Sequence, residues 1–67
     1  MNTRKRLRMT LGVDSSDDSQ EIYQVLSKME EKVDFGVIPC EKLVLIVVDG
    51  PILWGVNSIR SFLDRVS

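Results

Sequence analysis

The first patterned stretch of the chain, residues 6–13, alternates polar and apolar positions. In an extended strand, successive side chains point to opposite faces. One face of such a strand would carry Leu7, Met9, Leu11 and Val13. The opposite face would carry Arg6, Arg8 and Thr10. The alternation therefore predicts a β-strand over residues 6–13 with one apolar side.

A helical period follows the strand. Apolar residues recur at spacings of three and four, at Ile22, Val25, Leu26, Met29 and Val33. This stripe predicts an amphipathic helix over about residues 18–33, and Phe35-Gly36 supplies a stop signal. Capping-box patterns at Asp18/Glu21, or more weakly at Ser16/Ser19, mark its beginning.

The run from Leu43 to Val48 supports two interpretations. Its β-branched residues favour a buried strand, with Asp49-Gly50 as a hairpin turn and Ile52-Leu53-Trp54 as the returning strand. Alternatively, a buried helix begins at Pro39 and ends at Gly50-Pro51. Periodicity alone cannot decide between them, because the run is short and wholly apolar.

The last segment predicts a helix capped by Asn57 or Ser58. Its apolar positions are Val56, Ile59, Phe62, Leu63 and Val66.

Charge is distributed unevenly along the 67 residues. Four of the nine basic residues lie in positions 1–8, so this segment carries +4, whereas the other 59 residues carry five bases and ten acids, or −5. Residues 1–5 are predicted to be a basic flexible arm, and residues 6–67 a single small domain. A basic arm on an acidic body favours an anionic partner, with nucleic acid first among the candidates.

Size and composition limit the ways in which this domain can be stabilised. A core of this size rarely supplies more than roughly 3–5 kcal/mol, and small domains commonly add disulfides, a metal or a second subunit. Cys40 is the single cysteine and the sequence contains no histidine, which excludes an intrachain disulfide and a Cys/His zinc site. A homodimer is therefore expected, with no metal and no cofactor.

Enzymatic activity is not expected. Without histidine, acid–base catalysis near neutral pH would need a carboxylate or lysine with a strongly shifted pKa, in a chain too short to enclose much of a pocket. The longest apolar run, from Leu43 to Val48, is far shorter than the ~20 residues that span a bilayer, and no secretory signal pattern follows the basic N-terminus. A cytoplasmic protein without a membrane partner is the expectation.

The N-terminal half resembles a known DNA-binding family. The stretch Lys5-Arg6-Leu7-Arg8-Met9-Thr10-Leu11, the helix from Ile22 to Met29 and the turn glycine Gly36 are similar to the ribbon-helix-helix proteins, the class of the Arc and MetJ repressors. The likeness covers roughly residues 4–36. It implies a mostly α fold with one N-terminal β-strand, which pairs with the same strand of a second subunit, and here an extra C-terminal helix. The paired ribbon would lie in the major groove of double-stranded DNA.

The resemblance assigns roles to ten residues. DNA contacts would come from Arg4, Lys5, Arg6, Arg8 and Thr10. The dimer core would contain Leu7, Met9, Leu11, Leu26 and Met29. The function implied is that of a sequence-specific DNA-binding protein, either a small transcriptional repressor or a partition adaptor.

The strand interpretation of the C-terminal half leads to a different hypothesis. The chain would then be an α+β protein in the order strand, helix, hairpin, helix. Its function would be that of a small protein-binding module that inhibits or recruits a partner protein. Contacts would come from Ile52, Leu53 and Trp54, because aromatic anchors commonly dominate protein interfaces.

Overall fold

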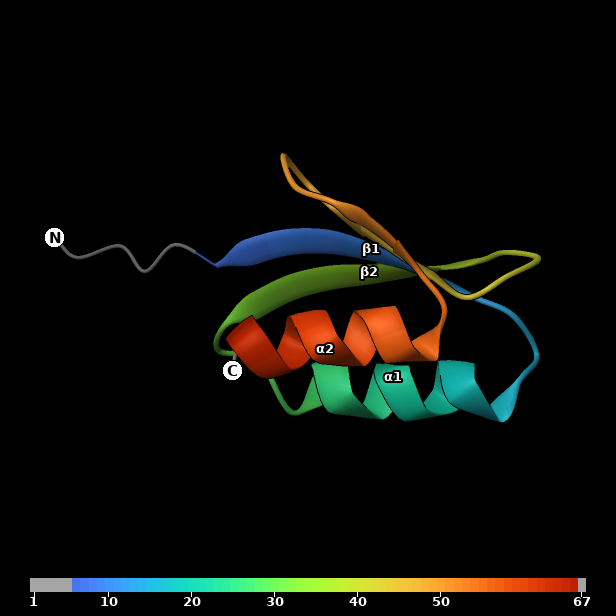
Figure 1. Cartoon of the computed structure of the whole chain (residues 1–67). Coiled ribbons are helices and arrows are strands. Elements are labelled where there is room, and N and C mark those ends of the chain that lie inside the picture. Colours follow the sequence, from blue (N-terminus) through green and yellow to red (C-terminus); the bar gives the residue numbers. More distant parts are fainter. Residues whose placement is uncertain (1–5, 67) are drawn as a thin grey trace, which may run out of the picture.

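The computed structural model describes residues 6–66 and places both helices on the same side of a β-sheet (Figure 1). The elements, in chain order, are β1 (Leu7–Val13), α1 (Asp17–Ser27), β2 (Val33–Pro39), β3 (Val44–Val47), β4 (Ile52–Trp54) and α2 (Val56–Val66). In this described part the four strands form one mixed sheet in the order β2-β1-β3-β4. The face opposite the helices is called the open face below.

The strand β1 lies inside the sheet and is paired along both sides. It runs parallel to β2, with Leu7 beside Val33, and antiparallel to β3, with Leu11 beside Leu45. The strands β3 and β4 form an antiparallel hairpin, whose turn contains Asp49 at a φ of 59°. Both backbone edges of β1 are therefore already occupied by strands of its own subunit.

The predicted fold class is wrong. The structure is α+β with a four-stranded mixed sheet and two helices, not a mostly α fold with one strand. A ribbon-helix-helix dimer requires β1 to offer a free edge to a second subunit, and β2 and β3 cover both edges. For residues 44–54 the structure shows the hairpin of the alternative interpretation, but that alternative did not include β2.

The first helix is shorter than its apolar stripe predicted, because it ends at Ser27 instead of residue 33. The chain turns after Lys28, where the backbone N–H groups of Lys32 and Val33 both donate to the carbonyl of Met29, at 2.8 and 2.9 Å. Val33 then joins β1 in the sheet, so strand pairing outweighs local helical preference there. At the other end, Ser16 is the N-cap, and its hydroxyl accepts from the N–H of Ser19.

The core lies between the sheet and the two helices. Strand residues that point toward the helices are buried together with the inner faces of α1 and α2 (Figure 1). The fully enclosed side chains are Leu11, Ile22, Leu26, Val33, Leu45, Ile59 and Leu63. An ion pair between Arg60 and Glu21 joins the two helices on the solvent side. All of this packing lies on one face of the sheet.

Candidate functional site

Of the four basic residues predicted to contact DNA, Arg6 and Arg8 belong to the described part of the chain. Arg4 and Lys5 lie outside the described residues. The guanidinium of Arg6 turns back to the chain, where it donates to the carbonyl of Val33 at 2.9 Å and to that of Glu30. Its hydrogen-bonding capacity therefore stabilises the turn that leads into β2.

Arg8 and Thr10 lie on the open face of β1. Arg8 is in register with Asp34 on β2, and Thr10 with Gly36, so an acid accompanies the base. The ribbon geometry that would have aimed Arg6 and Arg8 at base edges is absent from residues 6–66. DNA binding itself stays a prediction, measured by titrating duplex DNA with the protein and with an Arg6→Ala/Arg8→Ala variant.

Most of the residues predicted to form a dimer core lie in the core of the single subunit. Met9, Leu11 and Leu26 are buried there, and Met29 is partly buried against them. Leu7, at the start of β1, is 36% exposed. Apart from Leu7, these side chains therefore pack in the core of their own chain.

The open face is defined by the register of the strands. Neighbouring residues of paired strands point to the same side, and alternate residues along a strand point to opposite sides. Leu11 and Leu45 face the helices. The residues that alternate with them along β1 and β3, and those in register with these on β2 and β4, therefore face outward. The outward positions are Asp34, Gly36 and Ile38 on β2, Arg8, Thr10 and Gly12 on β1, Val44 and Ile46 on β3, and Ile52 and Trp54 on β4.

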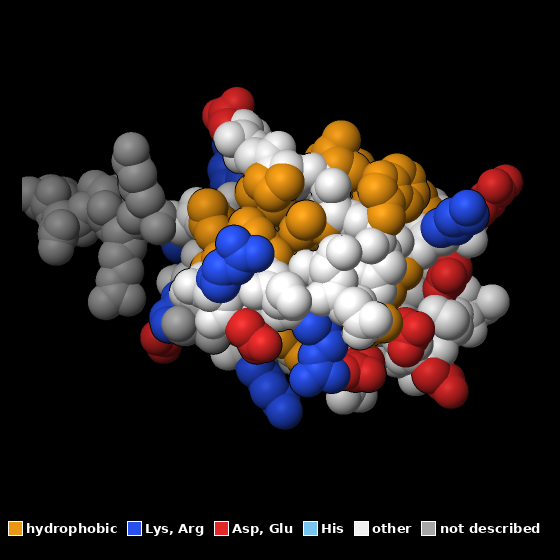
Figure 2. Space-filling view, viewed as in Figure 1, with side chains coloured by type: hydrophobic (Ala, Val, Ile, Leu, Met, Phe, Trp, Pro, Cys, Tyr) orange, Lys and Arg blue, Asp and Glu red, His pale blue; other side chains and the backbone are white. Residues whose placement is uncertain are grey.

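Apolar side chains dominate much of this open face. The apolar patch, as the term is used below, consists of Ile38, Ile46, Ile52 and Trp54, and Trp54 is the most exposed of the large hydrophobic residues, at 61%. In the space-filling view, hydrophobic side chains gather over the β3–β4 hairpin, whereas most charged side chains lie over the helices and at the ends of the molecule (Figure 2). Patches of several hundred Å² on a monomer often mark an interaction site.

Of the three residues predicted to contact a protein, two belong to this patch. Ile52 and Trp54 project from the open face, while Leu53 points to the helices and packs against the core. The sequence interpretation did not identify Ile38 or Ile46. Ile46 lies inside the run whose period was ambiguous. Ile38 follows the alternation Val33-Asp34-Phe35-Gly36-Val37, which marks β2 and could have identified it.

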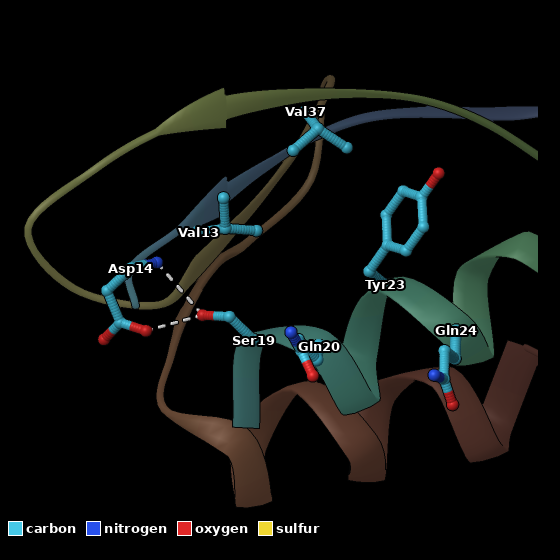
Figure 3. Close-up of a pocket in the computed structure, with 7 residues that line it drawn as sticks. All are labelled: Val13, Asp14, Ser19, Gln20, Tyr23, Gln24 and Val37. Atoms are coloured by element: carbon cyan, nitrogen blue, oxygen red, sulfur yellow. Dashed lines mark hydrogen bonds between the residues drawn. The ribbon is translucent and has the colours of Figure 1, made fainter. Parts of the chain in front are cut away.

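A second feature is a hollow of about 420 Å³ between α1 and β2. It is lined by Val13, Asp14, Ser19, Gln20, Tyr23, Gln24 and Val37 (Figure 3). The close-up shows Tyr23 reaching from α1 toward β2, while Asp14 and Ser19 meet at the end where β1 leads into α1. The ring of Tyr23 also stands edge-on to Phe35, with ring centroids 6.0 Å apart.

The Asp14 carboxylate at this end holds the helix N-terminus in place. Its Oδ1 accepts from the Ser19 hydroxyl at 2.6 Å, from the Ser16 hydroxyl, and from the Ser16 N–H at 3.0 Å. These hydrogen bonds, first that of the Ser16 hydroxyl and then that of Ser19, lower the pKa of Asp14 from 3.8 to about 2. A carboxylate with a pKa this low is a poor general base near neutral pH. Its hydrogen bonds to Ser16 and Ser19 stabilise the N-terminus of α1 instead.

The Asp14 cluster makes stability depend on pH in a defined window. A depressed pKa in the folded state adds stability above pH 3.8, and this contribution is lost as the pH falls from 3.8 toward 2. We expect Asp14→Ala to be less stable than the parent at neutral pH, and the two proteins to converge as the pH falls through this window. Urea unfolding at several pH values measures the difference, with Glu41→Ala as the control for removing one exposed acid. A difference that stays constant down to pH 2 would contradict the assignment.

Other chemistry finds little support in residues 6–66. No group of three or more His, Cys, Asp or Glu side chains in this range is arranged to hold a metal ion. Neither of the helices in the same range has the length and apolar character needed to cross a membrane. The thiol of Cys40 is exposed and free.

Comparisons of the chain with protein-family models, with curated proteins and with solved structures gave no match.

Proposed function

We propose that this protein is a small protein-binding module, not an enzyme, and that its open face receives an amphipathic helix of a partner protein. The observation behind the proposal is the apolar patch around Trp54 on a sheet face that no helix of residues 6–66 covers. A sheet with an apolar face is stable when another layer buries that face. The helices α1 and α2 already provide such a layer on the other side.

The charges around the patch support an apolar partner surface over a nucleic acid. At one end of the open face, Arg8 is in register with Asp34. At the other end, Glu41 and Lys42 border a small hollow beside Trp54. Each of these two pairs combines one acid with one base, and the apolar patch lies between the pairs. Within residues 6–66 these pairs give no local excess of bases of the kind that a phosphate backbone requires, whereas a helix with an apolar stripe and mixed polar flanks suits this pattern.

Trp54 is expected to be the anchor of the interface. Interface energy concentrates in a few residues, Trp among the commonest, and such residues cost about 2 kcal/mol or more of binding free energy when truncated. The cytoplasmic location expected from the sequence is part of the same proposal.

The test begins with a photo-crosslinking amino acid at Ile52, which identifies the partner and its contacting segment in the source cell. The affinity of that segment is then measured by titration. We expect Trp54→Ala to weaken binding by about 30-fold or more, the equivalent of 2 kcal/mol. Tyr23→Ala, which removes an exposed aromatic ring on the helix side, is the matched control and should leave the affinity unchanged. Equal losses in both variants, or a non-helical contacting segment, would contradict the proposal.

A further inference from the structure

The outer edge of β2 is the longest strand edge that residues 6–66 leave without a partner strand. β2 has seven residues and pairs only with β1 in this range, whereas the opposite edge of the sheet is β4, which has three residues and directly follows Pro51. Short strands and prolines protect sheet edges from pairing with other chains. The β4 edge has this protection, whereas β2 is longer and has a proline only at its last residue.

The pairing with β1 determines which backbone groups of β2 are available. The carbonyl of Lys32 accepts from Leu7, and the N–H of Cys40 donates to Val13, at 3.1 and 2.8 Å. In a parallel ladder, alternate residues direct both backbone groups to the same neighbour. The backbone groups of the even-numbered residues of β2 therefore point to β1. Those of Val33, Phe35, Val37 and Pro39 point away from β1, to the free edge.

Neither end of this outward row offers a free N–H group. The N–H of Val33 donates to Met29 at 2.9 Å, and its carbonyl accepts from Arg6 at 2.9 Å. Pro39, at the other end, has no N–H and offers only its carbonyl. Phe35 and Val37 thus lie between two blocked positions, and each offers one donor and one acceptor. This arrangement is symmetric about Gly36.

We infer that the occupant of this edge is a second copy of the chain, which adds its own β2 antiparallel with Gly36 opposite Gly36. In this register Phe35 exchanges two hydrogen bonds with Val37 of the second copy, and Val37 does the same with Phe35 of the second copy. Every outward group of Phe35 and Val37 is then paired, and the two blocked positions, Val33 and Pro39, face each other. A shift by two residues places Phe35 opposite Pro39, whose carbonyl accepts one bond but which donates none in return, or Val37 opposite Val33, whose two groups are already bonded. Either shift leaves an outward group of Phe35 or Val37 unpaired.

The side chains and helices next to β2 suit this arrangement. Residues opposite each other in antiparallel strands share a face, so Phe35 of one copy lies beside Val37 of the other on the helix side, next to the hollow that Val37 lines. The side of α1 at this hollow carries the uncharged residues Gln20, Tyr23 and Gln24, and Asp14 is the charged residue of the lining. Three strand spacings separate the two β1 strands by about 14 Å, enough for two α1 helices packed at about 8–10 Å.

The inference does not rest on the proposed function, because the β2 edge and the apolar patch around Trp54 are different surfaces. A dimer of this kind joins two sheets into one and leaves both copies of Trp54 exposed. It also differs from the predicted ribbon, in which β1 was the pairing strand.

The variant Val37→Pro tests the pairing directly. It removes one outward N–H and leaves the β1–β2 ladder intact, since the N–H of Val37 does not face β1. In sedimentation equilibrium we expect the parent and Val37→Ile to approach twice the 7.6 kDa chain mass with increasing concentration, and Val37→Pro to stay at the monomer mass. Circular dichroism confirms that the variants fold, and Trp54→Ala, which alters only the proposed helix-binding face, should dimerise as the parent does.

A distance measurement tests the register. Cys40 is exposed and is the single cysteine, so it can carry a spin label. It lies four residues from Gly36, and the antiparallel register places the two Cys40 Cα atoms about 27 Å apart along the strands. A dimer with this distance that Val37→Pro abolishes supports the inference. A parent that is monomeric throughout, a dimer that survives Val37→Pro, or a clearly different distance would overturn it.

Discussion

Replacing Leu45 by alanine is expected to cost about 2–5 kcal/mol of unfolding free energy, the range observed when a buried Leu is truncated. Leu45 is completely buried in β3, under the helices and beside Leu11. A domain of this size rarely has more than roughly 3–5 kcal/mol of stability from its core. We therefore expect Leu45→Ala to be largely unfolded at room temperature, as measured by urea titration followed by circular dichroism.

The neighbouring residue supplies the matched control. Ile46 is the next residue of the same strand, but it lies on the open face and is 38% exposed. Ile46→Ala removes a similar amount of side chain and should cost much less, because water already reaches this site and a smaller cavity results. Comparable losses at the two positions would mean that the open face is buried in the free protein, against the orientation of the sheet described above.

The sequence predicted those elements whose pattern has one interpretation. The alternation of residues 6–13 is that of β1, and the stripe that contains Ile59 and Leu63 is that of α2. The hairpin appeared as one of two alternatives for Leu43 to Val48, because an apolar run of six residues has no period to separate strand from helix.

The element that the sequence interpretation missed is β2, and this omission led to the wrong fold. Met29 and Val33 continue the helical spacing of Ile22 and Leu26, so Val33 was assigned to the helix. In the structure Val33 is 1% exposed and lies beside Leu7 in the sheet, a pairing between residues 26 positions apart. Local periodicity contains no information about such a partner, and tertiary contacts override local propensity.

The candidate site was only partly predictable for the same reason. Ile52 and Trp54 stand out by residue type, and both lie on the open face. Whether Arg8 faces DNA or an acid depends on its neighbour Asp34, which comes from the missed strand. The sequence interpretation assigned Arg8 to DNA because it did not show that Asp34 of β2 lies beside Arg8.

The two glycines of the open face provide the second large contrast in stability. A Cβ added to Gly12 would lie 2.7 Å from Cγ1 of Val44 and 2.8 Å from Sγ of Cys40, whereas a Cβ on Gly36 meets no atom within 4 Å. Val44 is β-branched and held in β3, so it cannot move aside without strain. We expect Gly12→Ala to lower the unfolding free energy by about 1–3 kcal/mol, the usual cost of overpacking.

The same substitution at Gly36 should have the opposite or no effect. Its φ lies outside the left-handed region, and alanine restricts the unfolded chain, which can add about 0.4–1 kcal/mol of stability when the native backbone tolerates it. Chemical denaturation of the two single variants, with Gly12→Ala/Cys40→Ala to remove the contact with Sγ, measures the difference. If Gly12→Ala were as stable as Gly36→Ala, Val44 and Cys40 would not close over Gly12.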